Sequence, residues 1–309
     1  MRILMVGAGG TGGYFGGRLA VAGRDVTFLV RAKRAGILRS GGLSIRSPLG
    51  DVHVARPQLV TADQIAQPFD LIVLSCKAYD LTNAIESFAP AVGRNTAILP
   101  LLNGMAHLAV LEDRFGAARV LGGMCFISST TAADGTILHL NDTHRLTFGE
   151  RGDPLTPRIE AIAKQLSDAG FDAVLSDNVM QEMWNKWIFI ASSAGMTCLM
   201  RSAIGDYVAA GAAPLASQLV DECAAVADAA GYAASDAALE GVRAYVTQAG
   251  STISTSMLRD IENKSAIEAD QIIGDMLERA RKLGASPILA MAYAHLKSYE
   301  ARRKRETSN

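Results

Sequence analysis

The sequence predicts an α/β protein in which a Rossmann-like, doubly wound sheet is followed by an all-α C-terminal domain. Short apolar stretches alternate with helical ones through the first half of the chain, and a glycine-rich turn follows the first of them. The strand signals stop after Asp177. At 309 residues the chain is long enough for two domains, which we expect at 1–177 and 178–309.

The predicted strands of the main sheet are short apolar runs at residues 2–6, 25–30, 71–75 and 96–101. Helices are expected to begin near Gly12, Asp80 and Met105. Alternating polar and apolar residues predict a hairpin over 43–54, appended to the sheet, and a second one formed by 137–141 with 145–149. A helix from Pro157 and a strand over 172–176 follow, and Ala-rich helices continue to the C-terminus.

The composition indicates a small-molecule partner. Lys and Arg number 30 against 31 Asp and Glu, so no global field attracts nucleic acid or an anionic membrane surface. No apolar run is long enough to span a bilayer. The scattered cysteines argue against a disulfide framework and a zinc site, and they fit a cytoplasmic location: Cys76, Cys125, Cys198 and Cys223. The oligomeric state stays open, and we favour a homodimer.

A dinucleotide-binding fingerprint lies at the start of the chain, in the turn made of Gly7, Ala8, Gly9, Gly10, Thr11 and Gly12. It follows an apolar strand, opens a helix and precedes a second strand, as the fingerprint requires. The first glycine permits the tight turn and the second lets the backbone approach a pyrophosphate. The third allows close helix packing, while the helix N-terminus faces the anion.

The end of the second strand determines which dinucleotide is expected. An acidic residue there would bond the ribose hydroxyls of NAD, but this sequence has Arg31, followed by Lys33 and Arg34. Such a cationic cluster suits a ribose 2′-phosphate, so we predict NADP (NADPH) over NAD. The alternative is a solvated basic loop.

Several further motifs resemble those of the ketopantoate reductase family, the NADPH-dependent reductases that make pantoate on the route to coenzyme A. The resemblance runs nearly from end to end of the chain. Besides the glycine turn and Arg31, it rests on Ser75-Cys76-Lys77-Ala78, Leu102-Asn103-Gly104-Met105, Glu182-Met183-Trp184-Asn185-Lys186, Ser256-Met257 and Ile267-Glu268-Ala269-Asp270.

The resemblance implies a role for each of these residues. Lys77 and Asn103 would lie along the cofactor, with Asn103 near the nicotinamide, and both follow predicted strands, where open α/β sheets bind ligands. Lys186 would donate a proton to the substrate carbonyl oxygen as hydride arrives. Glu268 would bind the substrate hydroxyl or orient Lys186, and Ser256 would donate to the substrate carboxylate.

Two positions depart from the family pattern. Ketopantoate reductases carry substrate-contacting asparagines one and two helical turns beyond the lysine, where this chain has Ile190 and Ala194. Because spacings of four and eight share a helix face, both changes make the same wall of the pocket apolar. Ser192 and Ser193 lie on other faces and cannot replace the asparagines.

Three functions therefore stay open. The leading one is reduction of the 2-oxo acid ketopantoate (2-dehydropantoate) to pantoate. A second keeps this chemistry for a more apolar 2-oxo acid or ketone, as Ile190 and Ala194 indicate. A third, of another class, is a non-catalytic NADP-binding sensor, against which the retention of Lys186, Ser256 and Glu268 argues. Hydrolase motifs of the G-x-S-x-G and H-E-x-x-H types are absent from the sequence.

Overall fold

The chain folds into two compact units, which a computed structural model describes over residues 1–152 and 155–307. The first, here the N-terminal unit, contains Met1–Leu102 and His107–Val179. The second, here the helical unit, contains Met180–Asn309 together with the short segment Asn103–Ala106. The helical unit therefore includes four residues that begin three positions after a strand of the N-terminal unit ends at Pro100.

The N-terminal unit is built on a parallel, five-stranded sheet in the order β5-β2-β1-β6-β7. This is the order of a Rossmann half-sheet, with β1 at the centre. Its strands are β1 (Arg2–Val6), β2 (Asp25–Leu29), β5 (Gln58–Val60), β6 (Phe69–Leu74) and β7 (Val92–Pro100). The near-continuous burial of β1 and β6 is typical of strands covered on both faces. The predicted Rossmann-like fold is confirmed.

A second sheet has the order β10-β9-β3-β4, with β8 also paired to β9. Its strands are β3 (Leu43–Arg46), β4 (Val52–Val54), β8 (Gly122–Thr131), β9 (Ile137–Gly149) and β10 (Asp172–Leu175). The hairpin predicted over 43–54 forms, but β3 pairs with β9, so its predicted attachment to the main sheet was wrong.

The second predicted hairpin is also wrong, because residues 137–149 form one continuous strand, β9, that pairs with β8. Its polar centre, read as a turn, lies opposite a register shift between Ile127 and Ser129. There the side chain of Asn141 accepts a hydrogen bond from the backbone N–H of Ser128 at 2.9 Å. A side chain thus satisfies a strand N–H where the ladder is irregular.

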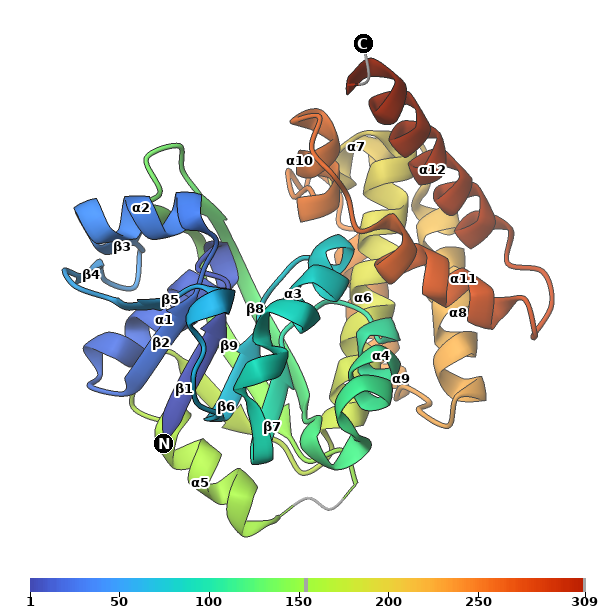
Figure 1. Ribbon diagram of the computed structural model, residues 1–309. Coiled ribbons are helices and arrows are strands. Elements are labelled where there is room, and N and C mark those ends of the chain that lie inside the picture. The colour runs from blue at the N-terminus through green and yellow to red at the C-terminus, as the bar shows by residue number, and fades with distance from the viewer. Residues whose placement is uncertain (153–154, 308–309) are drawn as a thin grey trace. The chain divides into compact units, whose positions relative to one another are not determined.

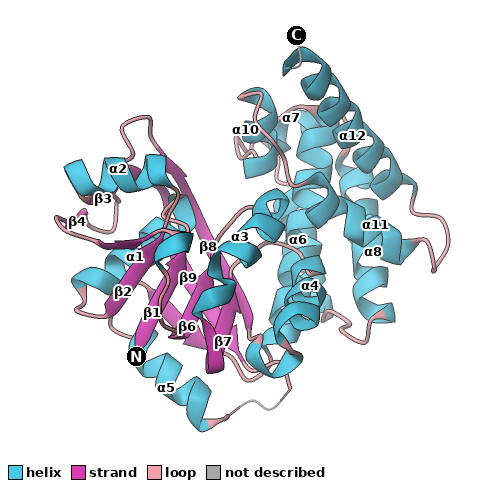
Figure 2. Cartoon of the chain, in the orientation of Figure 1, coloured by secondary structure: helices cyan, strands magenta, loops and turns pink. Residues whose placement is uncertain are grey.

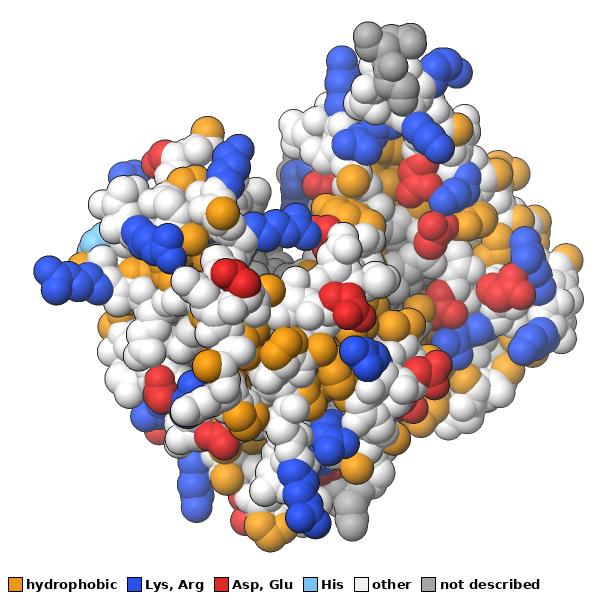
Figure 3. All heavy atoms as spheres, in the orientation of Figure 1, with side chains coloured by type: hydrophobic (Ala, Val, Ile, Leu, Met, Phe, Trp, Pro, Cys, Tyr) orange, Lys and Arg blue, Asp and Glu red, His pale blue; other side chains and the backbone are white. Residues whose placement is uncertain are grey.

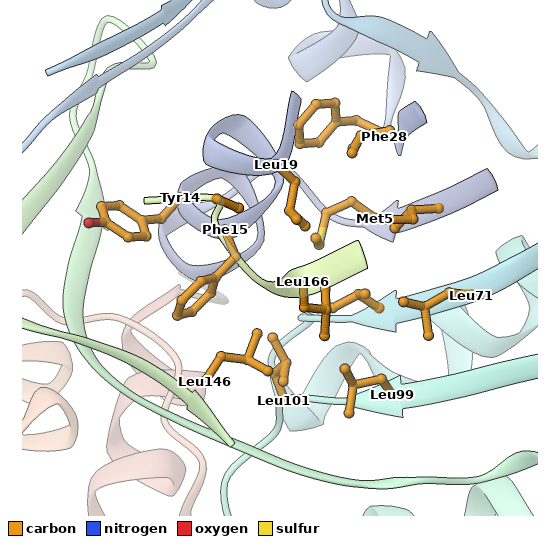
Figure 4. Packing of buried hydrophobic residues seen from close by; sticks show 14 of the residues in the cluster. Met5, Tyr14, Phe15, Leu19, Phe28, Leu71, Leu99, Leu101, Leu146 and Leu166 are labelled. Atoms are coloured by element: carbon orange, nitrogen blue, oxygen red, sulfur yellow. The ribbon is translucent and has the colours of Figure 1, made fainter. Parts of the chain in front are cut away.

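The described residues of the N-terminal unit also form the α-helices α1 (Gly10–Val21), α2 (Ala32–Gly41), α3 (Leu81–Phe88), α4 (Ala106–Phe115) and α5 (Pro157–Leu166). They enclose a core in which Met5, Phe28 and Leu71 lie with Phe15 and Leu166 (Figure 4). Tyr14 belongs to the same cluster, but its hydroxyl points away from the other labelled side chains. That hydroxyl bonds Nδ1 of His144 at 2.8 Å.

The helical unit has no strand among its described residues, in keeping with the predicted all-α domain (Figures 1 and 2). Its helices are α6 (Val179–Met200), α7 (Ile204–Ala209), α8 (Ala213–Ala229), α9 (Asp236–Val246), α10 (Ser256–Glu262), α11 (Asp275–Ala280) and α12 (Pro287–Thr307). A π-helical turn, Asp270–Gly274, leads into α11. Inserted π turns frequently occur at functional sites.

The visible face mixes Lys and Arg side chains with Asp and Glu, without a large region of one sign (Figure 3). This matches the net charge of −1 for the whole chain. Among residues 1–152 and 155–307, no helix is long and apolar enough to cross a bilayer.

Candidate functional site

The glycine turn joins β1 to α1 and leaves its backbone open to a ligand. Gly7 has φ +96°, a left-handed conformation that favours glycine, and its N–H donates to Leu29 O at 3.0 Å. Gly9 is exposed, and a Cβ there would meet nothing within 4 Å. The first N–H groups of α1, which begins at Gly10, are therefore available to an anion that approaches past Gly9.

Ser75 braces this turn from the end of β6. Its hydroxyl donates to Val6 O at 2.9 Å. A Cβ on Gly12 would overlap that hydroxyl and would lie 2.5 Å from Gly7 O, so only glycine fits at position 12. The sequence places Ser75 in a recognisable motif, but the contact itself comes from the pairing of β1 with β6.

Arg34, on the first turn of α2, supports the turn from the other side. Its Nε donates to Ala8 O at 3.0 Å and its Nη1 to Gly135 O at 2.9 Å. Burial lowers the pKa of this guanidinium from its ordinary value, although an arginine stays charged. Arg34 thus helps to hold the turn in shape.

Arg31 caps the start of α2 and has a carboxylate partner. Its Nη2 lies 2.9 Å from Oδ1 of Asp80, with 75% of the Arg31 side chain and 34% of the Asp80 side chain exposed. This pairing was not predicted, because 49 positions separate Arg31 and Asp80 in the chain. Lys77 lies nearby in sequence, exposed, at the start of the short 3-10 turn Ala78–Asp80 after β6.

A second cluster, within the helical unit, brings Lys186 and Asn103 together. Lys186 Nζ, on α6, donates to Oδ1 of Asn103 at 3.0 Å. Lys186 is only 7% exposed, so its ammonium is buried rather than directed to water. A buried ammonium hydrogen-bonded to a polar side chain is typical of a functional lysine.

The π-helical turn packs against this pair. Gln271 Nε2 donates to Asn103 O at 2.7 Å, and Trp187 Nε1 donates to Ile272 O at 2.9 Å. Glu268, one turn earlier, is 8% exposed, so the acidic residue expected at the site is buried in the same segment. Gln271 was not among the predicted site residues, although it directly follows the motif that contains Glu268.

Ser256 is not brought to the lysine by any contact that the structure describes. It is the exposed first residue of α10. Its neighbour Thr255 caps that helix and its hydroxyl lies 2.8 Å from Thr197 Oγ1, which fixes the start of α10 to α6. Ser256 therefore occupies a defined place beside the C-terminal half of α6.

Ile190 and Ala194 lie on α6, one and two turns after Lys186, as the helical spacing requires. Ile190 is half-buried and Ala194 is 4% exposed. The hydroxyls of Ser192 and Ser193 donate to Ile188 O and Phe189 O, each at 2.7 Å. These hydroxyls are held by their own helix, so the wall beyond the lysine is apolar.

Comparison with known proteins assigns both halves of the chain to one family. Residues 3–153 match the family model "Ketopantoate reductase PanE/ApbA", and residues 178–300 match its C-terminal counterpart. The protein "Uncharacterized oxidoreductase YkpB" of Bacillus subtilis is 39% identical over 303 residues, covering 97% of this chain and 99% of its own. The 2-dehydropantoate 2-reductase of Mesorhizobium japonicum is 26% identical, covering 91% and 92%.

A solved structure agrees. The 2-dehydropantoate 2-reductase of Geobacter metallireducens superposes with a TM-score of 0.88 at 27% identity, covering 96% of this chain and 99% of that one. The glycine turn, the buried lysine and these matches over both halves lead to one conclusion: the chain belongs to the ketopantoate reductase family of oxidoreductases.

Proposed function

We propose that this protein uses NADPH to reduce a 2-oxo acid to a 2-hydroxy acid, with 2-dehydropantoate (ketopantoate) as the favoured substrate and pantoate as the product. The observation that carries the proposal is the hydrogen bond from Nζ of the buried Lys186 to Oδ1 of the half-buried Asn103, at 3.0 Å. The product would serve pantothenate and coenzyme A biosynthesis. A cytoplasmic location is part of the same proposal.

The glycine turn fits a pyridine dinucleotide. The open backbone at Gly9 admits a pyrophosphate, and the exposed Arg31 and Lys77 follow β2 and β6 at the carboxyl ends of parallel strands. Gly10 and Thr11 open the helix that faces the anion. We assign the 2′-phosphate of NADPH to Arg31, because a guanidinium binds phosphate oxygens in a bidentate way.

When bound, NADPH supplies the hydride that adds to the carbonyl carbon of the substrate. Negative charge then builds on the carbonyl oxygen, and the Lys186 ammonium stabilises it and gives it a proton. Asn103 Oδ1 keeps the ammonium in one place before the reaction. The buried carboxyl of Glu268 binds the substrate hydroxyl or orients Lys186, and Ser256 binds the substrate carboxylate.

The test is a Lys186→Ala variant. Loss of the proton donor is expected to lower kcat by roughly 10²- to 10⁴-fold and to change NADPH affinity by less than about twofold. NADPH oxidation with ketopantoate measures the first quantity, and NADPH fluorescence measures the second. Lys282→Ala, an exposed lysine of the same unit, is the control. A Lys186→Ala enzyme with normal turnover refutes the proposal.

A second candidate is the same reaction on a more apolar 2-oxo acid, which the half-buried Ile190 and the buried Ala194 favour. A site without amide partners loses discrimination for a hydroxylated substrate. Values of kcat/KM across a panel of 2-oxo acids separate the candidates, as does rescue of a pantothenate-requiring strain. Tight NADPH binding with no turnover on any 2-oxo acid would indicate the non-catalytic sensor instead.

A further inference from the structure

The π-helical turn Asp270–Gly274 is joined to α6 and to the segment after β7 by contacts from two adjacent residues. The turn is wider than an α-helical turn, because the N–H of Asp275 donates to the carbonyl of Asp270, five residues earlier. Ile272 O accepts the indole N–H of Trp187, which is 1% exposed. The turn is therefore fixed to α6 at the residue that directly follows Lys186.

Both the side chain and the backbone of Gln271 lie against residues 103–104, which follow β7. Its Nε2 donates to Asn103 O at 2.7 Å, and its side chain is buried, at 8% exposure. Gly104 has φ +75°, and a Cβ there would lie 2.5 Å from Gln271 O. The Asn103-Gly104 backbone is thus pressed against Gln271 and tied to it.

These contacts form a closed path. Gln271 Nε2 bonds the backbone of Asn103, whose side chain accepts a hydrogen bond from Lys186 Nζ. The next residue after Lys186, Trp187, bonds the carbonyl of Ile272, which directly follows Gln271. Each hydrogen bond in the path is 3.0 Å or shorter. The position of the ammonium is therefore linked to Gln271 through Asn103.

We propose that Gln271 is a positioning residue for the reaction, acting through Asn103 on Lys186. The inference rests on the proposed function, in which Lys186 donates the proton. Proton transfer depends steeply on placement, and a displacement of about 1 Å costs on the order of 100-fold in rate. Gln271 keeps Asn103 Oδ1 where it holds the ammonium.

The test compares Gln271→Met with a matched control, Gln181→Met. Gln181 Nε2 also donates to a backbone oxygen of the helical unit, that of Tyr232 at 3.1 Å. Gln271→Met is expected to lower kcat by roughly 10- to 100-fold, with the KM for NADPH changed by less than about twofold. Hydrogen exchange of the amides in Gly104–106 should accelerate in this variant. Gln181→Met should show neither effect.

Unchanged kcat and unchanged exchange in Gln271→Met, in a protein whose Lys186→Ala variant is inactive, would overturn the positioning role alone. Normal turnover of Lys186→Ala would instead overturn the proposed function. A fall in kcat with unaltered exchange would also overturn the inference, because Asn103 would not have moved. If Gln271→Met folds poorly, Gln271→Glu is tested instead. The glutamate side chain has nearly the same shape as glutamine but has an acceptor oxygen in place of the donor amide, and kcat and hydrogen exchange are measured as before.

Discussion

Arg31 carries the prediction of NADPH as cofactor, and the structure gives it a partner. Asp80 Oδ1 lies 2.9 Å from its guanidinium, from the loop after β6. Exposed ion pairs are weak, so a 2′-phosphate can displace this carboxylate. The carboxylate nevertheless remains close to the site and repels a phosphate, while it does not oppose a ribose hydroxyl.

Asp80→Asn is therefore expected to strengthen NADPH binding by about three- to tenfold and to leave NADH binding within about twofold. Dissociation constants from NADPH and NADH fluorescence titrations measure the effect. Glu86→Gln, the control, removes the same charge from α3, where Glu86 forms an ion pair with Arg114 at 4.0 Å. Weaker NADPH binding in Asp80→Asn would show that the carboxylate orients Arg31 rather than opposing the phosphate.

Sequence motifs could predict which residues belong to the site, but they could not predict which of these residues contact each other. Lys186 and Asn103 stand in motifs, and the structure joins them although each motif was read alone. Gln271 and Asn103 lie 168 positions apart, and Arg31 and Asp80 lie 49 apart. Such pairs arise from packing of distant segments, which residue type and local spacing do not encode. The bonds of Arg34 to two distant backbone carbonyls arise in the same way, and its charge alone was visible in the sequence.

At the scale of elements, the glycine turn contains one glycine that close packing requires, Gly12, and one that leaves space for a ligand, Gly9. Gly12 packs against Ser75 and Gly7 O, so Gly12→Ala must displace backbone and is expected to cost about 1–3 kcal/mol of unfolding free energy. Gly9→Ala meets nothing within 4 Å and should keep its stability. Its methyl group would stand where a pyrophosphate approaches, so NADPH binding should weaken by at least about tenfold.

Urea denaturation and NADPH titration of the two variants measure these effects. Equal loss of stability in both would contradict the steric argument, and full NADPH affinity in Gly9→Ala would contradict the assignment of the pyrophosphate to this turn.

The predicted elements succeeded where hydrophobic periodicity was strong. β1, β2 and β6 begin and end within two residues of prediction, because each is a short, mostly apolar run, and β1 and β6 are almost entirely buried. α2 was missed because only Ala35 and Leu38 of its ten residues are buried, which leaves little amphipathic signal. β8 was missed because it begins with Gly122-Gly123 and ends in polar residues. Its place is set by its long pairing with β9.

At the scale of the whole molecule, oligomeric state is a separate expectation. The chain matches its relatives over nearly its full length, and a homodimer remains the state that we favour, although the Ala-rich helices could pack either within the helical unit or across a dimer interface. Light scattering coupled to size-exclusion chromatography measures the mass directly. A mass equal to the 32.6 kDa of one chain across the concentration range would reject the dimer.

The surroundings of His144 in the N-terminal unit predict how the stability of the protein depends on pH. Burial lowers the pKa of His144, Arg18 and His139 add to this by repulsion, and Asp172 opposes it. Arg18 is itself buried, at 7% exposure, and its Nη2 bonds Ser47 Oγ and the carbonyls of Leu49 and Gly50. The folded unit therefore holds positive charge beside a histidine that is stable when neutral.

A histidine whose pKa is lowered on folding binds protons more readily in the unfolded chain. Stability is then full above the ordinary histidine pKa of about 6.5 and falls as the pH drops below it. One such proton contributes at most about 1.4 kcal/mol per pH unit to the slope. His144→Gln should reduce that slope between about pH 6.5 and about pH 5, because no group remains at this position to take up the proton.

Urea titrations followed by circular dichroism, at about pH 7.5 and about pH 5.5, measure this difference. Both tryptophans lie on α6, so their fluorescence does not report on the N-terminal unit, and a backbone signal is needed. His53→Gln makes the same chemical change on an exposed ring and serves as the control. If His144→Gln and the parent protein lose stability equally on acidification, the pH dependence of stability arises from groups other than His144. The repulsion between Arg18 and His144 then has no measurable effect on stability.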